Sequence, residues 1–127
     1  MDDRIFTWPE GPTKHYHATP NPADEPEACG LETIATLDDP NAFYSFDSII
    51  AWRDQATGVV YLAADYGCSC PTPFEGYAKL SDLTRVTTRE EAQDFVRQEN
   101  GSESNQTWPL RDVLTFLDAV EQALSHP

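Results

Sequence analysis

The chain has 127 residues, 39% of them hydrophobic and 11% aromatic, which suits one domain with a modest core and excludes disorder throughout. Its 22 acidic and 8 basic residues give a net charge of −14 at pH 7, which disfavours direct binding to nucleic acid or to an anionic membrane. The first residues form no signal peptide, and the apolar runs are too short to cross a bilayer. We therefore expect a soluble, cytoplasmic protein.

Residues 1–30 contain five of the ten prolines, and no apolar period runs through them. Proline lacks a backbone N–H and restricts the residue before it, so this segment is predicted to be an irregular, acidic arm. It also contains large apolar side chains, including Phe6 and Trp8. We therefore expect part of the arm to pack on a single α+β domain formed by residues 31–127.

Alternation of apolar and polar residues predicts three strands and a short fourth. The first covers residues 31–37. Residues 44–53 and 59–65 alternate most clearly, and Gly58 between them suits a position with positive φ, so these two strands are predicted to form a hairpin. Residues 80–86 are predicted to add a short strand.

Two helices are predicted after the strands. Thr88 and Glu91 form a capping-box pattern at the start of a helix over about 89–99. Pro109 suits the first turn of a second helix over about 109–125. The residues expected on the apolar side of this second helix are Leu110, Val113, Leu114, Leu117, Val120 and Leu124.

Strands that precede helices in this order predict an α+β fold. We expect a small antiparallel sheet, built from the hairpin 44–65 and neighbouring strands, to pack against the two C-terminal helices.

Residues 65–75 read Asp-Tyr-Gly-Cys-Ser-Cys-Pro-Thr-Pro-Phe-Glu, directly after a predicted strand. Gly67 permits a bend, the prolines stiffen the chain after it, and the small side chains fit a crowded turn. We interpret the segment as a tight turn. Aromatic residues flank it, and aromatic residues on loops often anchor protein interfaces. The candidate interaction residues are Tyr66, Cys68, Cys70, Phe74, Glu75 and Tyr77.

Zinc is the alternative interpretation of the cysteines. Structural zinc takes four ligands, but its cysteines are usually separated by two to four residues, whereas one residue separates Cys68 from Cys70. An odd number of cysteines also fits reduced thiols better than a disulfide scaffold. We therefore predict no bound metal or other cofactor. If zinc binds, the available ligands are Cys29, Cys68, Cys70, His15 and His17.

The sequence contains no motif that defines an enzyme. It has no glycine-rich phosphate loop, no HExxH and no G-x-S-x-G, and no motif links a histidine to Cys68 or Cys70. Asp65 and Glu75 are carboxylates near the turn, but two carboxylates close in sequence are weak support for acid–base catalysis. We predict that the protein is not an enzyme.

A resemblance to a known family rests on the central part of the chain. Its motifs are Trp52-Arg53-Asp54, Thr57-Gly58, Tyr61 and the segment 65–75, with the helix start Thr88-Arg89-Glu90-Glu91. In these motifs residues 31–98 resemble a family of small uncharacterised proteins from bacteriophages that infect actinobacteria. The resemblance implies a phage gene product in the host cytoplasm, and it implies no activity or catalytic residue.

Together these features predict a non-enzymatic protein-binding module that contacts a host or phage protein, for example as an inhibitor of a host factor or of a defence protein. A zinc-stabilised domain that uses the cysteine loop is the alternative. Mimicry of a nucleic acid by ordered carboxylates is a variant of the binding hypothesis. The sequence does not specify the partner or the oligomeric state.

Overall fold

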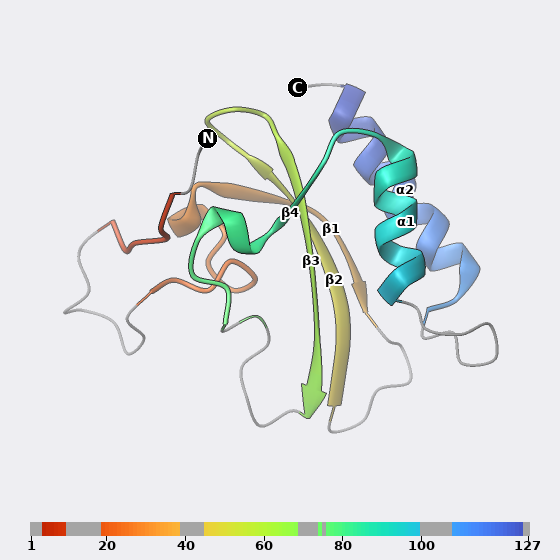
Figure 1. The fold of residues 1–127 in the computed structure, drawn as a ribbon, viewed down its shortest axis with the longest axis horizontal. Coiled ribbons are helices and arrows are strands. Elements are labelled where there is room, and N and C mark those ends of the chain that lie inside the picture. Colours follow the sequence, from red (N-terminus) through yellow and green to blue (C-terminus); the bar gives the residue numbers. More distant parts are fainter. Residues whose placement is uncertain are drawn as a thin grey trace.

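The computed structural model describes residues 4–9, 19–38, 45–68, 74, 76–99 and 108–125. Its elements are β1 (Leu31–Asp38), β2 (Ser45–Asp54), β3 (Val60–Cys68), β4 (Thr84–Val86), α1 (Arg89–Glu99) and α2 (Leu110–Ser125), with single-turn 3₁₀ helices at Glu27–Cys29 and Leu80–Asp82 (Figure 1). An antiparallel sheet followed by two C-terminal helices confirms the predicted α+β fold.

The strands lie in the sheet in their sequence order, β1-β2-β3-β4, and each pairs antiparallel with the next. The predicted hairpin is confirmed as β2 and β3, which pair from Ser45↔Cys68 to Arg53↔Val60. Gly58 has φ 79° in the connecting turn, as expected. Its N–H donates to the Asp54 carbonyl at 2.7 Å, which closes the turn.

A β-bulge divides β1. The pairing with β2 shifts between Thr33 and Ala35, so that Ile34 is the extra residue. Because an extra residue exchanges the two faces of a strand, the side chains before and after the bulge reach different cores. Leu31 packs on the sheet face away from the helices, whereas Leu37 packs on the helix face.

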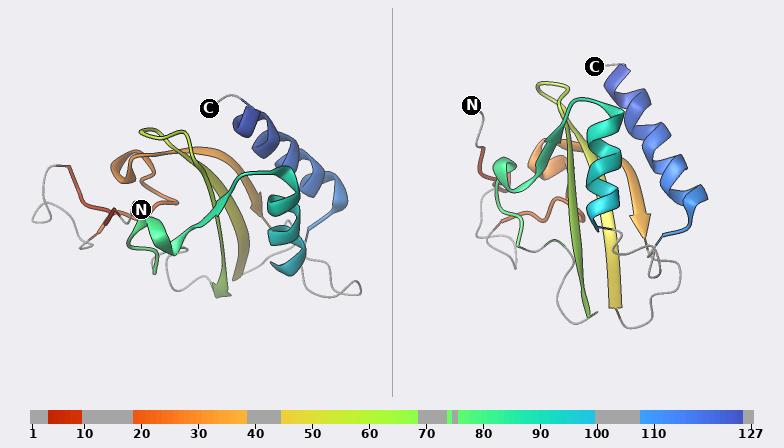
Figure 2. Two further views of the ribbon diagram at one scale, coloured as in Figure 1. Left: turned by 45° about the horizontal axis from the view of Figure 1, so that its top comes forward. Right: turned by 45° about the vertical axis from the view of Figure 1, so that its right-hand side comes forward.

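The two helices cover one face of the sheet, and Figure 2 shows them on that side in both views. Burial of apolar side chains between sheet and helices is the main stabilising contribution here. The capping box at the start of α1 is confirmed, because Glu91 N–H donates to the Thr88 hydroxyl and Thr88 N–H donates to the Glu91 carboxylate, each at 3.2 Å. The buried residues of this core are Leu37, Ile49, Ala51, Val60, Leu62, Val86, Ala92, Val96, Trp108, Phe116, Leu117 and Val120.

Irregular segments cover the opposite face, which confirms that part of the N-terminal arm packs on the domain. Phe6 is buried, and its N–H donates to the Ala78 carbonyl at 2.9 Å. The Trp52 indole N–H donates to the Pro22 carbonyl at 2.9 Å. The buried residues of this second core are Phe6, Cys29, Leu31, Ile50, Trp52, Ala63, Phe74, Leu80 and Leu83.

The strand predicted over residues 80–86 is shorter than expected. Residues 80–82 form a 3₁₀ turn, and only Thr84–Val86 pair with β3 as β4. The Asp82 carboxylate accepts hydrogen bonds from the N–H groups of Ala78 and Lys79, and these bonds favour a turn over an extended strand at this point.

The apolar side predicted for the last helix is partly wrong. Leu110 and Leu114 are exposed, whereas Phe116, which was not assigned to that side, is 2% exposed. The helix is rotated so that Phe116, Leu117 and Val120 face the sheet. No helix in the described part of the chain is both long and apolar enough to cross a membrane.

Candidate functional site

The predicted interaction loop is closed at its base by Asp65. One oxygen of this carboxylate accepts the Tyr66 N–H at 2.9 Å, and the other accepts the Phe74 N–H at 2.8 Å. Phe74 has φ 65°, the left-handed region that a bulky residue seldom occupies. A single side chain therefore joins the two ends of the loop.

Phe74 and Tyr77 hold the loop to the core. The Phe74 ring is 1% exposed and lies edge-on to Trp52, with ring centroids 6.0 Å apart. It also packs against Tyr77 at 5.5 Å, and the Tyr77 hydroxyl donates to the Ala64 carbonyl at 2.7 Å. Phe74 is thus a core residue and not an exposed anchor, which corrects the role expected for its side chain.

Tyr66 is placed as an interface residue requires, with 74% of its surface exposed. Cys68 is the last residue of β3. The Cys68 side chain and all of Cys70 and Glu75 lie outside the described residues. The structure therefore does not gather these side chains into one site. Phe74 and Tyr77 pack in the second core, whereas the exposed Tyr66 follows the alternation of Leu62 and Ala64 on the helix face of β3.

The proposed zinc ligand Cys29 lies in the second core, where it is 2% exposed, and its thiol lies 3.8 Å from the Pro20 carbonyl oxygen. Burial raises the pKa of this thiol to about 12, so it stays protonated at neutral pH, although zinc binds the thiolate. His15, His17 and Cys70 lie outside the described residues. Within the part that the structure describes, no group of three or more His, Cys, Asp and Glu side chains is arranged to hold a metal ion.

The buried thiol predicts a loss of stability in alkaline solution. Below pH 9 the Cys29 thiol is protonated in both the folded and the unfolded chain. Between pH 9 and about pH 12 the unfolded chain loses this proton while the folded chain keeps it, so unfolding becomes more favourable. The free energy of unfolding should then fall by up to about 1.4 kcal/mol per pH unit because of this group. Burial also raises the pKa of Tyr77, which adds to the loss above pH 10.

Urea denaturation from pH 8 to pH 11 measures this effect. Cys29→Ala should show a shallower fall of stability with pH than the wild type, and Tyr77 should account for part of the fall that remains. Equal slopes for the two proteins would show that the Cys29 thiol does not stay protonated in the folded chain.

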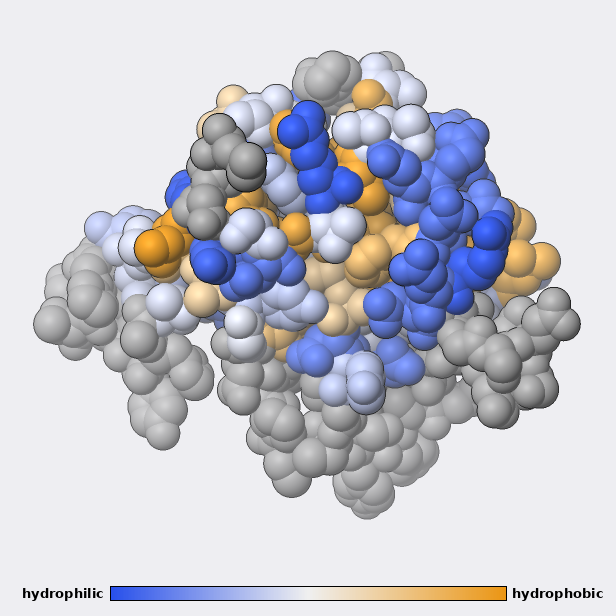
Figure 3. All heavy atoms as spheres, viewed as in Figure 1, coloured by the Kyte–Doolittle hydropathy of each residue, from blue (hydrophilic) through white to orange (hydrophobic). Residues whose placement is uncertain are grey.

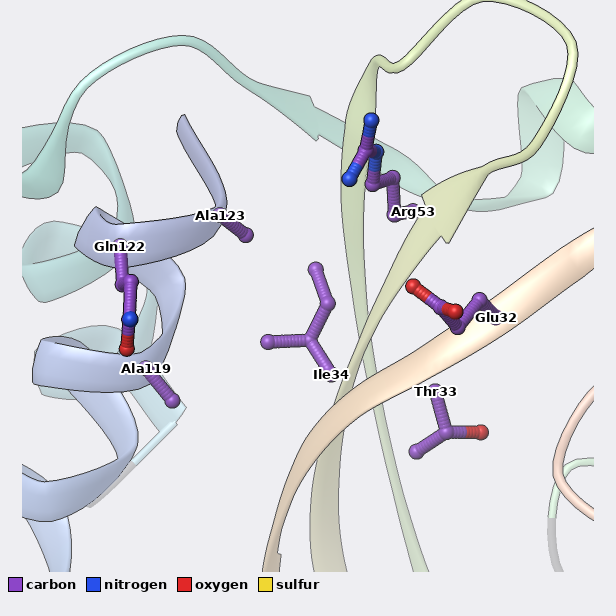
Figure 4. Close-up of a pocket in the computed structure, with 7 residues that line it drawn as sticks. All are labelled: Glu32, Thr33, Ile34, Arg53, Ala119, Gln122 and Ala123. Atoms are coloured by element: carbon purple, nitrogen blue, oxygen red, sulfur yellow. The ribbon is translucent and has the colours of Figure 1, made fainter. Parts of the chain in front are cut away.

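A groove lies between β1 and α2. Two cavities of about 350 and 390 Å³ lie along it and share Ile34 and Ala119. Figure 4 shows the Ile34 side chain directed into the space between strand and helix, with Ala119 and Ala123 directed toward it from α2. We call this feature the β1–α2 groove. Its lining consists of Glu32, Thr33, Ile34, Ala35, Thr36, Leu37, Asp38, Arg53, Arg111, Asp112, Thr115, Phe116, Ala119, Gln122 and Ala123.

The groove exists because of small residues on α2 and the bulge in β1. Ala119 and Ala123 are four residues apart and share one side of the helix, so their methyl groups leave space above the strand. The bulge lets Ile34 and Ala35 both pack toward the helix core, which gives the groove an apolar floor.

Charged residues of both signs border the groove. Glu32 and Arg53 are partners across β1 and β2 and lie near the C-terminal half of α2. Asp38, Arg111 and Asp112 lie at the other end, where the Asp38 carboxylate accepts the Ser48 hydroxyl at 2.6 Å. Among the described residues, neither Arg53 nor Arg111 forms an ion pair.

Sequence reasoning did not find the groove. The sequence signal for a groove is the pair of small residues Ala119 and Ala123 in a helix whose other residues are mostly larger. Alanine is common in helices because it favours them, so this pair indicates a groove only weakly. Figure 3 shows how much of one face is hydrophilic over the helices, with apolar residues visible between them and the sheet.

The fold and the groove define a small α+β domain whose antiparallel sheet is covered on both faces and whose first strand borders an apolar groove. The chain belongs to the family described as Domain of unknown function (DUF7574), whose model matches residues 20–126. The matched stretch includes all four strands, both helices and the part of the arm at 20–30. No curated protein and no solved structure matches the chain.

Proposed function

We propose that this protein is a non-enzymatic protein-binding module of an actinobacteriophage, which acts in the host cytoplasm on a host or phage protein such as a host factor or a defence protein. The phage assignment is supported by the resemblance of the central motifs at Trp52–Asp54 and residues 65–75. The binding role is supported by one structural observation: the edge of β1 lies beside the β1–α2 groove.

An edge strand offers backbone N–H and C=O groups to another strand. β1 is eight residues long, and within the described ranges it pairs only with β2. Peptide recognition by strand addition combines such an edge with pockets for alternate side chains. The groove provides these pockets through Ile34, Ala119 and Ala123, so the occupant we propose is an extended segment of the partner protein that pairs with β1.

The charges of the groove favour a peptide over a polyanion. Its border combines Glu32, Asp38 and Asp112 with Arg53 and Arg111, and a polypeptide can complement both signs. A nucleic acid would meet a chain with a net charge of −14. The occupant is thus an extended peptide with side chains of both charges around an apolar centre.

Photo-crosslinking tests the location. A benzophenone amino acid replaces Glu32, which is exposed and lines the groove on the helix face of β1, or Ala56, which is exposed in the hairpin turn. Irradiation in an actinobacterial lysate, taken before and after phage infection, should attach one reproducible protein at position 32 and not at position 56. Equal crosslinking from both positions, or none at position 32, would contradict the proposed groove.

A groove-filling variant tests the mechanism with the protein so identified. Ala119→Trp should place an indole in the groove and weaken binding at least about tenfold, because the partner segment loses its apolar pocket. Ala56→Trp is the matched control and should bind as the wild type does. An unchanged melting temperature would show that Ala119→Trp is folded. If Tyr66→Ala loses binding while Ala119→Trp keeps it, the interaction belongs to the loop and not to the groove.

A further inference from the structure

A second concave site lies on the sheet face opposite the helices. A cavity of about 310 Å³ opens between the β2–β3 turn and the segment 80–85. Ligand pockets begin at about this size and combine apolar surface with a few polar groups. We call it the Arg85 pocket. Its lining residues are Thr57, Val59, Tyr61, Leu80, Ser81, Leu83 and Arg85.

Apolar side chains form the greater part of the pocket. Leu80 and Leu83 are buried members of the second core and give it a rigid base. Tyr61 is half-buried and packs against the same core, so it adds an aromatic wall. These surfaces suit the apolar body of a small molecule, because burial of apolar area stabilises binding in a preformed pocket.

Among the described residues that line the pocket, Arg85 is the only charged one. It lies opposite Tyr61 in the pairing of β3 with β4, so both side chains share this face of the sheet. Over the described residues Arg85 forms no ion pair, whereas Arg4, Arg89 and Arg97 each do. The nearby Glu91 carboxylate accepts hydrogen bonds from Thr87 and Thr88, which lower its pKa, and the charge of Arg85 lowers that pKa further. Arg85 thus interacts with Glu91 through its charge and without a hydrogen bond, so its guanidinium keeps donors for a ligand.

The aliphatic hydroxyl groups of Thr57 and Ser81 at the pocket differ. The Thr57 hydroxyl donates to the Asp54 carboxylate at 2.8 Å and accepts the Val59 N–H at 3.3 Å, so its proton is already used. Ser81 is exposed and has no hydrogen bond among the described residues. Arg85 and Ser81 thus present donors beside an apolar surface.

We infer that the Arg85 pocket binds a small organic anion, with its charged group on Arg85 and Ser81 and its apolar body on Leu80, Leu83 and Tyr61. The net charge of −14 repels anions in proportion to their charge, so the ligand class is a monoanion, such as a carboxylate or sulfonate on an aromatic or aliphatic body. The described residues that line the pocket are all different from those that line the β1–α2 groove, and the inference is independent of the proposed protein binding.

The test uses 8-anilinonaphthalene-1-sulfonate, an aromatic monoanion, as the probe. Titration followed by fluorescence and by amide chemical shifts should show binding, with the largest shifts in residues 57–61 and 80–85. Arg85→Gln should weaken the affinity about tenfold, because it removes a charge-assisted hydrogen bond. Arg97→Gln, which removes an exposed arginine of α1, is the matched control and should change the affinity by less than about twofold.

Uncharged N-phenyl-1-naphthylamine should bind the wild type and Arg85→Gln equally, which separates the charge effect from a loss of structure. Ala119→Trp should bind the sulfonate as the wild type does, so failure of the proposed groove and failure of this inference give different results. The inference is overturned if Arg85→Gln binds the sulfonate as tightly as the wild type, or if the shifts lie outside the two named segments.

Discussion

Replacing Phe74 with alanine is expected to lower the free energy of unfolding by about 3–5 kcal/mol. The ring is 1% exposed and lies against Trp52 and Tyr77, so its removal leaves a cavity in the second core. Urea denaturation followed by tryptophan fluorescence measures the change. A loss below about 1 kcal/mol would mean that the ring does not occupy the core in solution.

The backbone at this position adds a sharper comparison. Phe74 has φ 65°, which costs an alanine about 1–2 kcal/mol and a glycine almost nothing. Phe74→Gly should therefore be more stable than Phe74→Ala. Gln93, which is exposed within α1, supplies the control. Gln93→Gly should be less stable than Gln93→Ala by about 1 kcal/mol, because glycine disfavours a helix. The same order at both positions would contradict the left-handed conformation of residue 74.

Asp54→Ala is also expected to have a large effect, lowering the free energy of unfolding by about 3 kcal/mol. The carboxylate is fully buried and accepts hydrogen bonds from the Thr57 hydroxyl at 2.8 Å and from the Ala56 N–H at 3.3 Å. It also pairs with Arg4 at 3.3 Å, which joins the N-terminal arm to the hairpin turn. Alanine would leave the turn donors without a partner.

Asp118→Ala is the matched control for the loss of a carboxylate. Asp118 pairs with Arg89 at 2.8 Å, but its side chain is 72% exposed, and exposed pairs contribute about 0–1 kcal/mol. In thermal denaturation in dilute buffer, the melting temperature of Asp54→Ala should be well below that of Asp118→Ala. Similar melting temperatures for the two would show that the Asp54 carboxylate is hydrated and not part of the core.

The features that the sequence predicted well are those encoded by neighbouring residues. Alternation over 44–53 specified β2, because the side chains of a strand reach opposite faces in turn. The Thr88 and Glu91 pattern located the start of α1, since both hydrogen bonds of a capping box form within one turn. The order of strands and helices was enough for the fold class.

The candidate site was harder to predict, because its residues are brought together by contacts distant in sequence. The position of Phe74 after two prolines predicts an exposed side chain on a loop, but the ring is buried against Trp52. The groove depends on the bulge at Ile34 and on the orientation of α2, and the period of the helix alone did not distinguish Phe116 from Leu114. Local pattern specifies the elements, while mutual packing specifies which side chains remain accessible.

The sheet order β1-β2-β3-β4 has a consequence for synthesis on the ribosome. Each strand pairs with the one made just before it, so the sheet can assemble progressively as the chain emerges. The second core cannot assemble progressively in this way, because Arg4 and Phe6 form backbone hydrogen bonds with Leu80 and Ala78, which are made much later. Residues 4–6 are translated before the sheet but dock only after residues 78–80 have been made, and until then their apolar side chains are available to chaperones and to wrong partners.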